Sequence, residues 1–299
     1  MGVVLTSETI LLDGGLATEL EARGHDLSDA LWSARLLADA PEEIVAAHAA
    51  FFAAGADVAT TASYQASFAG FAARGIDLRT SAGLLRRSVT LAKEARDSAE
   101  PSGGRRRWVA ASVGPYGATL ADGSEYRGRY GLSRRELTAF HLPRMEVLAE
   151  AEPDLLALET VPDIDEAAAL VEALESLGLP AWLSYTVEGG TTRAGQSLAE
   201  AFAVVAERDE IVAVGVNCCD PADVAPAVAL ARDITGKPVV AYPNSGENWD
   251  ADGREWRGAP RFSPAELAAH ATGGPALLGG CCRVRPADIA TLARHIHLT

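Results

Sequence analysis

Short apolar segments alternate with helical patterns along the whole chain, and this alternation constrains the fold more than any other feature. Eight segments have β-strand character: 9–15, 56–63, 107–115, 153–160, 180–186, 211–218, 237–244 and 275–282. Each is bounded by Gly, Pro, Asp or Asn and is nearly continuous in apolar character, as strands buried on both faces of a parallel sheet are. We therefore expect eight parallel strands.

Helical patterns fill the intervals between these segments. Clear examples are 41–55, 132–151, 163–178 and 197–208. Pro41 followed by two glutamates is typical of a helix start, and a glycine closes the first and third patterns. Eight strand–helix units in 299 residues predict one domain over residues 1–299, a (β/α)8 TIM-type barrel, whose usual size is about 250 residues plus insertions.

A doubly wound sheet is the alternative architecture for such an alternation. That fold would place a Gly-x-Gly-x-x-Gly motif after the first strand, and the sequence DGGLATEL at 13–20 does not supply it. Two polar, glycine-rich stretches, 121–133 and 244–263, are predicted to be long loops after the third and seventh strands. In a barrel, loops at the C-terminal ends of the strands carry function.

The charge balance narrows the possible partners. The net charge is −15 and the sequence pI is about 4.8, which argues against nucleic acid or an anionic membrane surface as a partner. The sequence has no apolar run of the roughly 18–20 residues that a membrane span needs, and the N-terminus lacks the pattern of a signal peptide. We expect a cytoplasmic protein in a reducing compartment, and a monomer.

The four cysteines form two adjacent pairs, Cys218–Cys219 and Cys281–Cys282. A disulfide between neighbours strains the peptide that joins them, and in a reducing compartment cysteines more often bind metal, react or pack as small hydrophobic residues. Cys218 ends the sixth predicted strand, and Cys281 and Cys282 end the eighth. In a closed parallel barrel these ends share one rim, so the three sulfurs can converge.

Glycines at 279 and 280 permit a bend through which both residues of the second pair can aim inward. Three thiolates around an ion with an open fourth position is the arrangement of a catalytic zinc site. Burial as small apolar side chains remains the alternative at this point.

Other polar groups fall at the same predicted rim. They are Asp13, Gly14, Gly15, Thr61, Glu159 and Asn217. A single polar residue at a strand end often caps the following helix. Taken together, however, two carboxylates, a hydroxyl and a Gly-Gly turn could hold an ammonium group and a carboxylate, which suits an α-amino acid.

The segments LLDGGLATELEARG, TTASYQAS, GVNCCDP and GGCCR resemble the homocysteine S-methyltransferases, which are (β/α)8 zinc enzymes. The resemblance covers essentially the whole chain, and GHDLSDALWSAR is most similar to the branch that uses S-methylmethionine or S-adenosylmethionine as methyl donor. It implies Zn²⁺ bound by Cys218, Cys281 and Cys282. It also implies that homocysteine contacts these residues: Asp13, Gly14, Thr61 and Glu159.

The resemblance implies a reaction without a general base. Coordination to zinc deprotonates a thiol, and three thiolates plus the substrate thiolate leave the zinc site with a net charge of about −2. That charge attracts a cationic sulfonium donor, and methyl transfer neutralises both partners. Trp32 and Tyr64 could flank the donor through cation–π contacts, or could be core aromatics. Cys219 matches no ligand position.

Three other functions remain open from the sequence. A betaine-type donor is also cationic, so charge alone does not separate it from a sulfonium. Asp13 and Glu159 could form the acid and base of a barrel hydrolase, although that interpretation leaves the three cysteines without a role. The cysteines could also be a redox-sensitive set on a binding barrel without catalytic activity.

Overall fold

The computed structural model describes residues 9–27, 33–100, 104–250 and 255–296. Its central sheet comprises β1 (Ile10–Leu11), β2 (Val58–Thr60), β3 (Trp108–Val113), β4 (Leu155–Val161), β5 (Ala181–Tyr185), β8 (Ile211–Asn217), β9 (Val239–Tyr242) and β12 (Ala276–Leu278). The strands are parallel, in the order β1-β12-β9-β8-β5-β4-β3-β2. A parallel bridge between Leu12 and Val58 joins the two ends of this order. The predicted barrel is confirmed.

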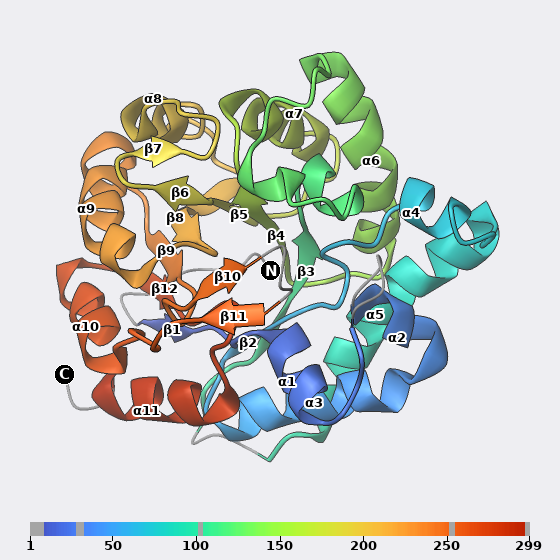
Figure 1. Ribbon diagram of the computed structural model, residues 1–299, viewed down its shortest axis with the longest axis horizontal. Helices are drawn as coiled ribbons and strands as arrows, with labels where there is room; N and C mark the ends of the chain where they lie inside the picture. The colour runs from blue at the N-terminus through green and yellow to red at the C-terminus, as the bar shows by residue number, and fades with distance from the viewer. Residues whose placement is uncertain (1–8, 28–32, 101–103, 251–254, 297–299) are drawn as a thin grey trace.

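Helices surround this ring of strands (Figure 1). The α-helices are α1 (Leu16–Ala22), α2 (Ser33–Asp39), α3 (Pro41–Ala53), α4 (Phe68–Ala72), α5 (Leu78–Ser98), α6 (Arg134–Glu150), α7 (Ile164–Leu174), α8 (Leu198–Ala203), α9 (Val224–Thr235), α10 (Pro264–Ala269) and α11 (Pro286–Ile296). Local signals set several of their starts. Pro41 occupies the first turn of α3, and Ser133 and Glu136 form a capping box at α6.

The core has two layers. Most buried apolar side chains lie in an outer cluster that includes residues of both the strands and the helices, while a smaller cluster belongs almost wholly to the strands. The smaller cluster combines the fully buried Trp182 with small residues such as Ala110, Ala157 and Ala213. Two large aromatic side chains, Trp182 and Tyr242, together with aliphatic and small residues fill the interior of the barrel, as close packing requires.

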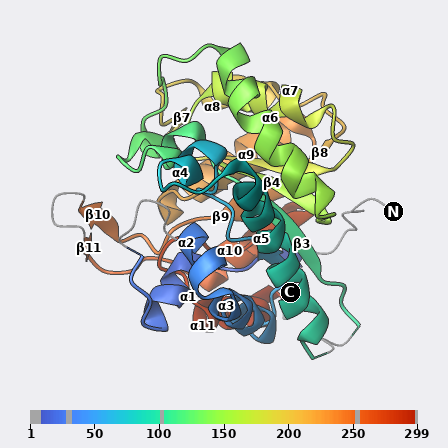
Figure 2. The ribbon, with the colours of Figure 1, turned by 90° about the vertical axis from the view of Figure 1, so that its right-hand side faces the viewer.

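Several short elements lie in the loops of the barrel, most of them at the C-terminal ends of the strands. Two antiparallel hairpins are formed by β6 (Val187–Glu188) with β7 (Thr191–Thr192), and by β10 (Asn248–Asp250) with β11 (Glu255–Arg257). The 3-10 turns η1 (Tyr116–Thr119) and η2 (Ser124–Tyr126) follow β3, and η3 (Pro221–Asp223) follows β8, whereas η4 (His270–Gly273) precedes β12 at the other end of the strands. Both hairpins lie at one end of the barrel (Figure 2). The stretch 244–263 was expected to be a loop throughout, and the β10–β11 hairpin corrects that prediction.

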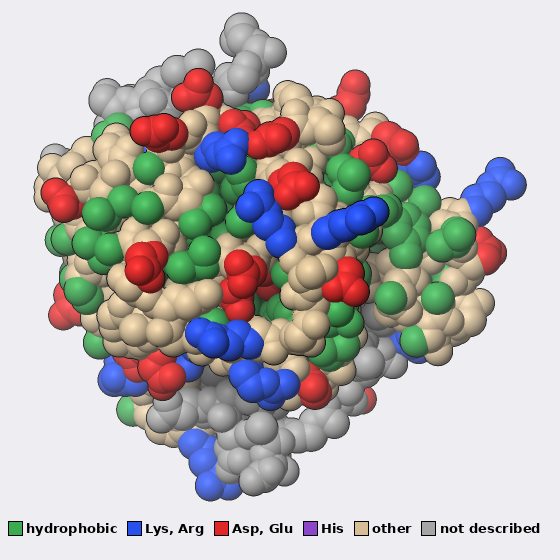
Figure 3. Space-filling view, turned by 90° about the horizontal axis from the view of Figure 1, so that it is seen from above, with side chains coloured by type: hydrophobic (Ala, Val, Ile, Leu, Met, Phe, Trp, Pro, Cys, Tyr) green, Lys and Arg blue, Asp and Glu red, His purple; other side chains and the backbone are tan. Residues whose placement is uncertain are grey.

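The distribution of charged side chains can be followed on one face of the molecule. Acidic and basic side chains are interspersed on the face shown in Figure 3, without a continuous basic area. Within the described part of the chain, no helix combines the length and the apolar character that crossing a membrane requires.

Candidate functional site

Three of the four cysteine sulfurs meet at the C-terminal rim of the barrel. The Sγ atom of Cys282 lies 3.8 Å from that of Cys218 and 4.0 Å from that of Cys281, and all three lie within 4.8 Å of one another. Tetrahedral zinc with Zn–S bonds of about 2.3 Å separates its sulfur ligands by about 3.8 Å. The donor set and its spacing therefore fit a metal ion held by three thiolates.

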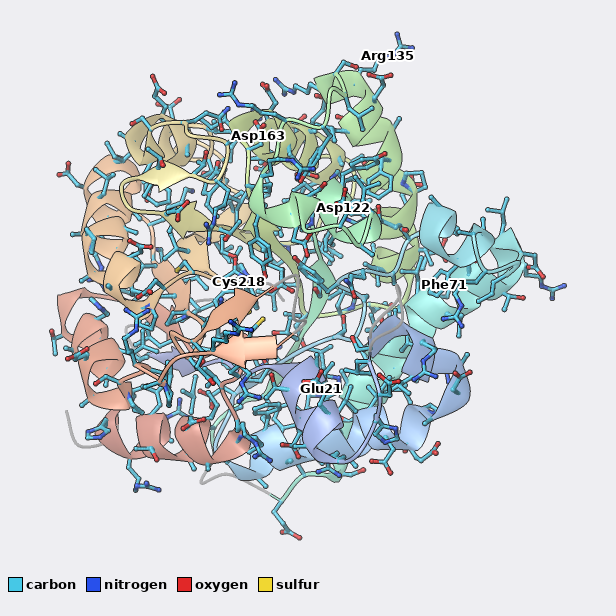
Figure 4. The ribbon with its side chains drawn as sticks, in the orientation of Figure 1. Glu21, Phe71, Asp122, Arg135, Asp163 and Cys218 are labelled. Atoms are coloured by element: carbon cyan, nitrogen blue, oxygen red, sulfur yellow. The ribbon has the colours of Figure 1, made fainter. Side chains whose placement is uncertain are left out.

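Backbone conformation turns Cys218 into this cluster. Its φ is +49°, in the left-handed region that non-glycine residues seldom adopt, and its N–H donates to the Tyr242 carbonyl of β9 at 3.2 Å. Cys218 lies near the centre of the ring of strands in Figure 4. The adjacent Cys219 is buried in the outer core cluster and is absent from the thiol cluster, as expected of a residue without a ligand role.

Close packing around Gly279 and Gly280 sets the position of the second pair. A Cβ on Gly279 would lie 2.6 Å from Leu12 Cβ, and one on Gly280 would lie 2.2 Å from Val284 Cγ1. The Cys281 N–H donates to the Pro243 carbonyl at 2.8 Å, and the Cys282 N–H donates to Asn244 Oδ1 at 3.1 Å. The segment after β12 is thus held against the end of β9, where both thiols join Cys218.

The three thiols of the cluster differ in pKa. Hydrogen bonds from Cys281 and Cys282 lower the pKa of Cys218 well below its ordinary value, assisted by the Tyr126 hydroxyl, 3.1 Å from Cys218 Sγ. The same hydrogen bonds to Cys218 raise the pKa of Cys281 and of Cys282. Burial raises the pKa of Cys219. Cys218 is therefore the thiol of the cluster that ionises first.

Asp13 and Glu159 are buried at the same rim. Asp13 accepts hydrogen bonds from the Thr60 N–H at 2.7 Å and from the Thr60 hydroxyl at 2.9 Å. Glu159 accepts from the Ser112 hydroxyl and, at 3.1 Å, from the Tyr242 hydroxyl. Burial raises the pKa of each carboxyl to about 7. Both carboxylates are held in fixed positions and can accept a cationic group.

Thr61 and Gly14 have structural contacts of their own. The Thr61 hydroxyl lies 2.7 Å from the Ser63 hydroxyl and accepts from the Ser112 N–H at 3.0 Å. A Cβ on Gly14 would lie 2.6 Å from the Val284 carbonyl oxygen, so this position needs glycine for close approach. Their proposed contacts with substrate stay predictions.

Of the two residues expected to contact the donor, only Tyr64 lies in the described part of the chain. Trp32 lies outside the described residues. Tyr64 is partly buried, and its ring lies where a Cβ on Gly114 would come within 2.7 Å of it. Burial and the charges of Glu125 and Cys218 raise the pKa of the Tyr64 hydroxyl far above its ordinary value. Tyr64 thus borders the site, and its donor contact stays a prediction.

Several site residues were missed by the sequence reasoning. Thr60, Ser112 and Tyr242 hold the two carboxylates, and Tyr126 contacts Cys218. Strand alternation could have indicated Ser112 and Tyr242, which stand on β3 and β9 near their C-terminal ends. The position of Tyr126 depends on how the 121–133 loop folds. In the sequence, the one indication that this residue is near the site was that its polar loop follows the third strand.

The fold and the site together define a barrel enzyme with a sulfur-lined centre at the C-terminal ends of its strands. A family model described as homocysteine S-methyltransferase matches residues 10–296. The chain is 45% identical to a homocysteine S-methyltransferase of Escherichia coli over 95% of its own length and 94% of that protein. It is 43% identical to homocysteine S-methyltransferase YbgG of Bacillus subtilis, with 96% and 94% covered.

Solved structures of an Escherichia coli relative agree with these matches. The homocysteine methyltransferase MmuM in its metallated form superposes with a TM-score of 0.86 at 43% identity, with 96% of each chain covered. Its apo form gives a TM-score of 0.79 at 36% identity, with 98% of each chain covered. The chain belongs to the homocysteine S-methyltransferase family.

Proposed function

We propose that the protein transfers a methyl group from a sulfonium donor, S-methylmethionine or S-adenosylmethionine, to the thiol of homocysteine, forming methionine, with Zn²⁺ held by Cys218, Cys281 and Cys282. The observation that carries this proposal is the convergence of three thiols whose Sγ separations of 3.8 and 4.0 Å suit tetrahedral zinc. Methyl transfer to homocysteine is the activity of the family to which the chain belongs.

Zinc bound in this cluster would coordinate the thiol of homocysteine at its open position and favour loss of the thiol proton. No side chain then has to act as general base. The three cysteine thiolates supply negative charge, which attracts a sulfonium. The homocysteine sulfur forms the new S–CH₃ bond with its own electron pair, and the electron pair of the broken bond stays on the donor sulfur. The donor becomes a neutral thioether.

The buried carboxylates would recognise the amino acid part of homocysteine. Glu159 and Asp13 lie at the same rim as the thiols and are fixed by hydrogen bonds from Ser112, Tyr242 and Thr60. Carboxylates positioned in this way can bind an α-ammonium group without reorganising. Burial raises the pKa of both groups, and a bound ammonium would favour their ionised form.

The relation to MmuM supports a metal in this cluster. That relative, at 43% identity, has been solved in a metallated form, and the three thiols offer a metal-ligand set in this chain. The assignment of zinc and of a sulfonium donor rests on the thiol chemistry and on the resemblance of the sequence.

A donor panel tests the proposal. Methionine formation from homocysteine should be measured with S-methylmethionine, S-adenosylmethionine, betaine and 5-methyltetrahydrofolate at equal concentrations, and zinc should be determined in protein purified without added metal. We expect about one zinc per chain and the fastest turnover with a sulfonium donor. Faster turnover with betaine would contradict the donor assignment. Absence of bound metal would contradict the zinc assignment and favour a redox or binding role for the cysteines.

A further inference from the structure

Another buried carboxylate, Glu125, lies in the loop between β3 and α6. It belongs to η2 and is 9% exposed. Its Oε2 atom is buried and has no hydrogen-bond partner among the described residues. This separates Glu125 from Asp13 and Glu159, each of which accepts two hydrogen bonds from protein donors. A buried carboxylate oxygen without a partner is costly, so this oxygen calls for an explanation.

The loop that carries Glu125 is fixed in place at both ends. Glu166 is fully buried in α7 and accepts hydrogen bonds from the Tyr116 N–H at 2.5 Å and from the Tyr130 hydroxyl at 3.2 Å. His141 of α6 lies 2.9 Å from the same Glu166 carboxylate. The loop backbone is also closely packed against itself, since a Cβ on Gly117 would lie 2.5 Å from the Glu125 nitrogen. The backbone at Glu125 is therefore held in a fixed position.

Glu125 is part of the thiol site. The hydroxyl of the next residue, Tyr126, lies 3.1 Å from Cys218 Sγ. The charge of Cys218 adds to the effect of burial in raising the pKa of Glu125 to about 7, and the charge of Glu125 in turn raises the pKa of Tyr64. Glu125 thus lies within electrostatic range of Cys218 and Tyr64, and the next residue of its loop contacts Cys218 directly.

The nearest cation of the loop does not neutralise Glu125. The Arg127 side chain is 66% exposed and donates to the Ser124 hydroxyl at 2.6 Å, and it lies 3.9 Å from Asp122. Arg193 stacks over the ring of Tyr126 at 5.6 Å and pairs with Glu188 at 3.2 Å. The charge of Arg127 lowers the pKa of Glu125, but burial outweighs it and the pKa stays raised. A positively charged ligand would stabilise the ionised form of this carboxylate.

We propose that Glu125 binds the α-ammonium group of the methyl donor, and so selects a sulfonium that is also an amino acid. The proposal rests on the function proposed above. Homocysteine is assigned the carboxylates of β1 and β4, which leaves Glu125, on a separate loop beside Cys218, for the second substrate. An ammonium donates N–H hydrogen bonds that an unpartnered Oε2 can accept, whereas a sulfonium has no such donor.

The test compares Glu125→Gln with Asp122→Asn. Both substitutions remove one negative charge from the same loop, but Asp122 is 54% exposed and accepts a hydrogen bond from the Ser124 N–H, which asparagine can also do. Glu125→Gln should raise the KM for S-methylmethionine by about 10- to 150-fold, the range for losing one charge-assisted hydrogen bond in a dry site. The homocysteine KM and the bound zinc should stay within about 2-fold in both variants, and Asp122→Asn should keep the wild-type donor KM.

A donor analogue without the amino group separates recognition from loop damage. The des-amino analogue of S-methylmethionine keeps the sulfonium and the carboxylate, so wild type and Glu125→Gln should bind it equally, measured as its inhibition constant against S-methylmethionine. An equal loss for both compounds would assign Glu125 a structural role and overturn the proposal. An unchanged donor KM in Glu125→Gln would also overturn it. Wild-type protein without methyl transfer from any sulfonium would instead refute the proposed function.

Discussion

The rim of the barrel has two sides that differ in how their polar groups are satisfied. On the side formed by β8, β9 and β12, three thiols lie together, and one of them, that of Cys218, contacts the hydroxyl of Tyr126. On the side formed by β1 to β4, the carboxylates of Asp13 and Glu159 each accept two hydrogen bonds from protein donors. We refer to these as the sulfur side and the carboxylate side.

This difference is what we expect if the sulfur side holds a metal and the carboxylate side holds an amino acid, as proposed above. Thiols without strong partners can lose their protons and close around an ion. Carboxylates that are already fixed lose little entropy when an ammonium binds. The sulfur side should therefore control metal content, and the carboxylate side should control the affinity for homocysteine. The predictions below test that division, from the largest expected effect to the smallest.

Loss of a thiol from the sulfur side should have the largest effect. Replacing Cys218, Cys281 or Cys282 by Ala should remove most of the bound zinc and lower turnover by at least about 100-fold, because a thiolate ligand is lost and the charge of the site changes. Zinc content and initial rates of methionine formation measure this. Full zinc in any of the three variants would break the assignment of that cysteine to the metal.

A change at Gly280 tests whether packing places the second pair. A Cβ there would lie 2.2 Å from Val284 Cγ1, so Gly280→Ala should destabilise the fold by about 1–3 kcal/mol and reduce bound zinc. Gly83→Ala in α5 is the control, because nothing lies within 4 Å of its added Cβ, and it should be neutral or stabilising. Thermal unfolding and metal analysis compare the two. Equal behaviour would show that the bend tolerates a side chain.

A change on the carboxylate side should affect the substrate and spare the metal. Glu159→Gln should raise the homocysteine KM by about 10- to 150-fold, the effect of losing a charge-assisted hydrogen bond of about 1.5–3 kcal/mol. Bound zinc should stay at the wild-type level. Steady-state kinetics with varied homocysteine measure this effect. Unchanged kinetics would show that Glu159 does not contact the substrate. Loss of zinc would show that the carboxylate side also contributes to metal binding.

The carboxylates should also make the metal-free protein sensitive to pH. Burial raises the pKa of Asp13, Glu125 and Glu159 to about 7, from ordinary values of 3.8 and 4.5. The folded protein then binds more protons than the unfolded chain between about pH 4 and 7, so its free energy of unfolding should fall as the pH rises through that interval.

Urea unfolding at pH 5, 6 and 7 measures this dependence. The fall should be at most about 1.4 kcal/mol per pH unit for each carboxylate, and Glu159→Gln should make it smaller. Burial of His48 and His141 lowers their pKa to about 4 and acts in the opposite direction, so the comparison of wild type with Glu159→Gln isolates the carboxylate. The same pH dependence in both would show that Glu159 is ionised throughout this range.

The smallest effect is expected for the cysteine that belongs to neither side. Cys219 is 1% exposed and packs in the outer core cluster, so Cys219→Ala should cost about 1 kcal/mol of stability through lost packing. Zinc content and turnover should match the wild type. If Cys219→Ala lost as much metal as Cys218→Ala, the choice within the first pair would be wrong.

The sequence by itself determined the architecture and the place of the site. Eight apolar segments matched eight strands, and only their lengths differed, as in β1, which spans two residues, Ile10 and Leu11. The C-terminal ends of parallel strands share one rim, so the strand positions alone brought Cys218, Cys281 and Cys282 to one end of the barrel. The carboxylates of Asp13 and Glu159 reached that rim by the same rule.

Only the tertiary structure gives the physical reason why Cys218 faces the site and its neighbour Cys219 does not. Cys218 enters the cluster and Cys219 does not, because a φ of +49° directs the first thiol inward while the second packs among apolar side chains. Thr60, the neighbour of the expected Thr61, holds Asp13. Tyr126 reaches the thiol of Cys218 through a loop folded against α6 and α7. Side-chain direction and loop path depend on contacts between residues far apart in the chain, and local sequence patterns do not encode them.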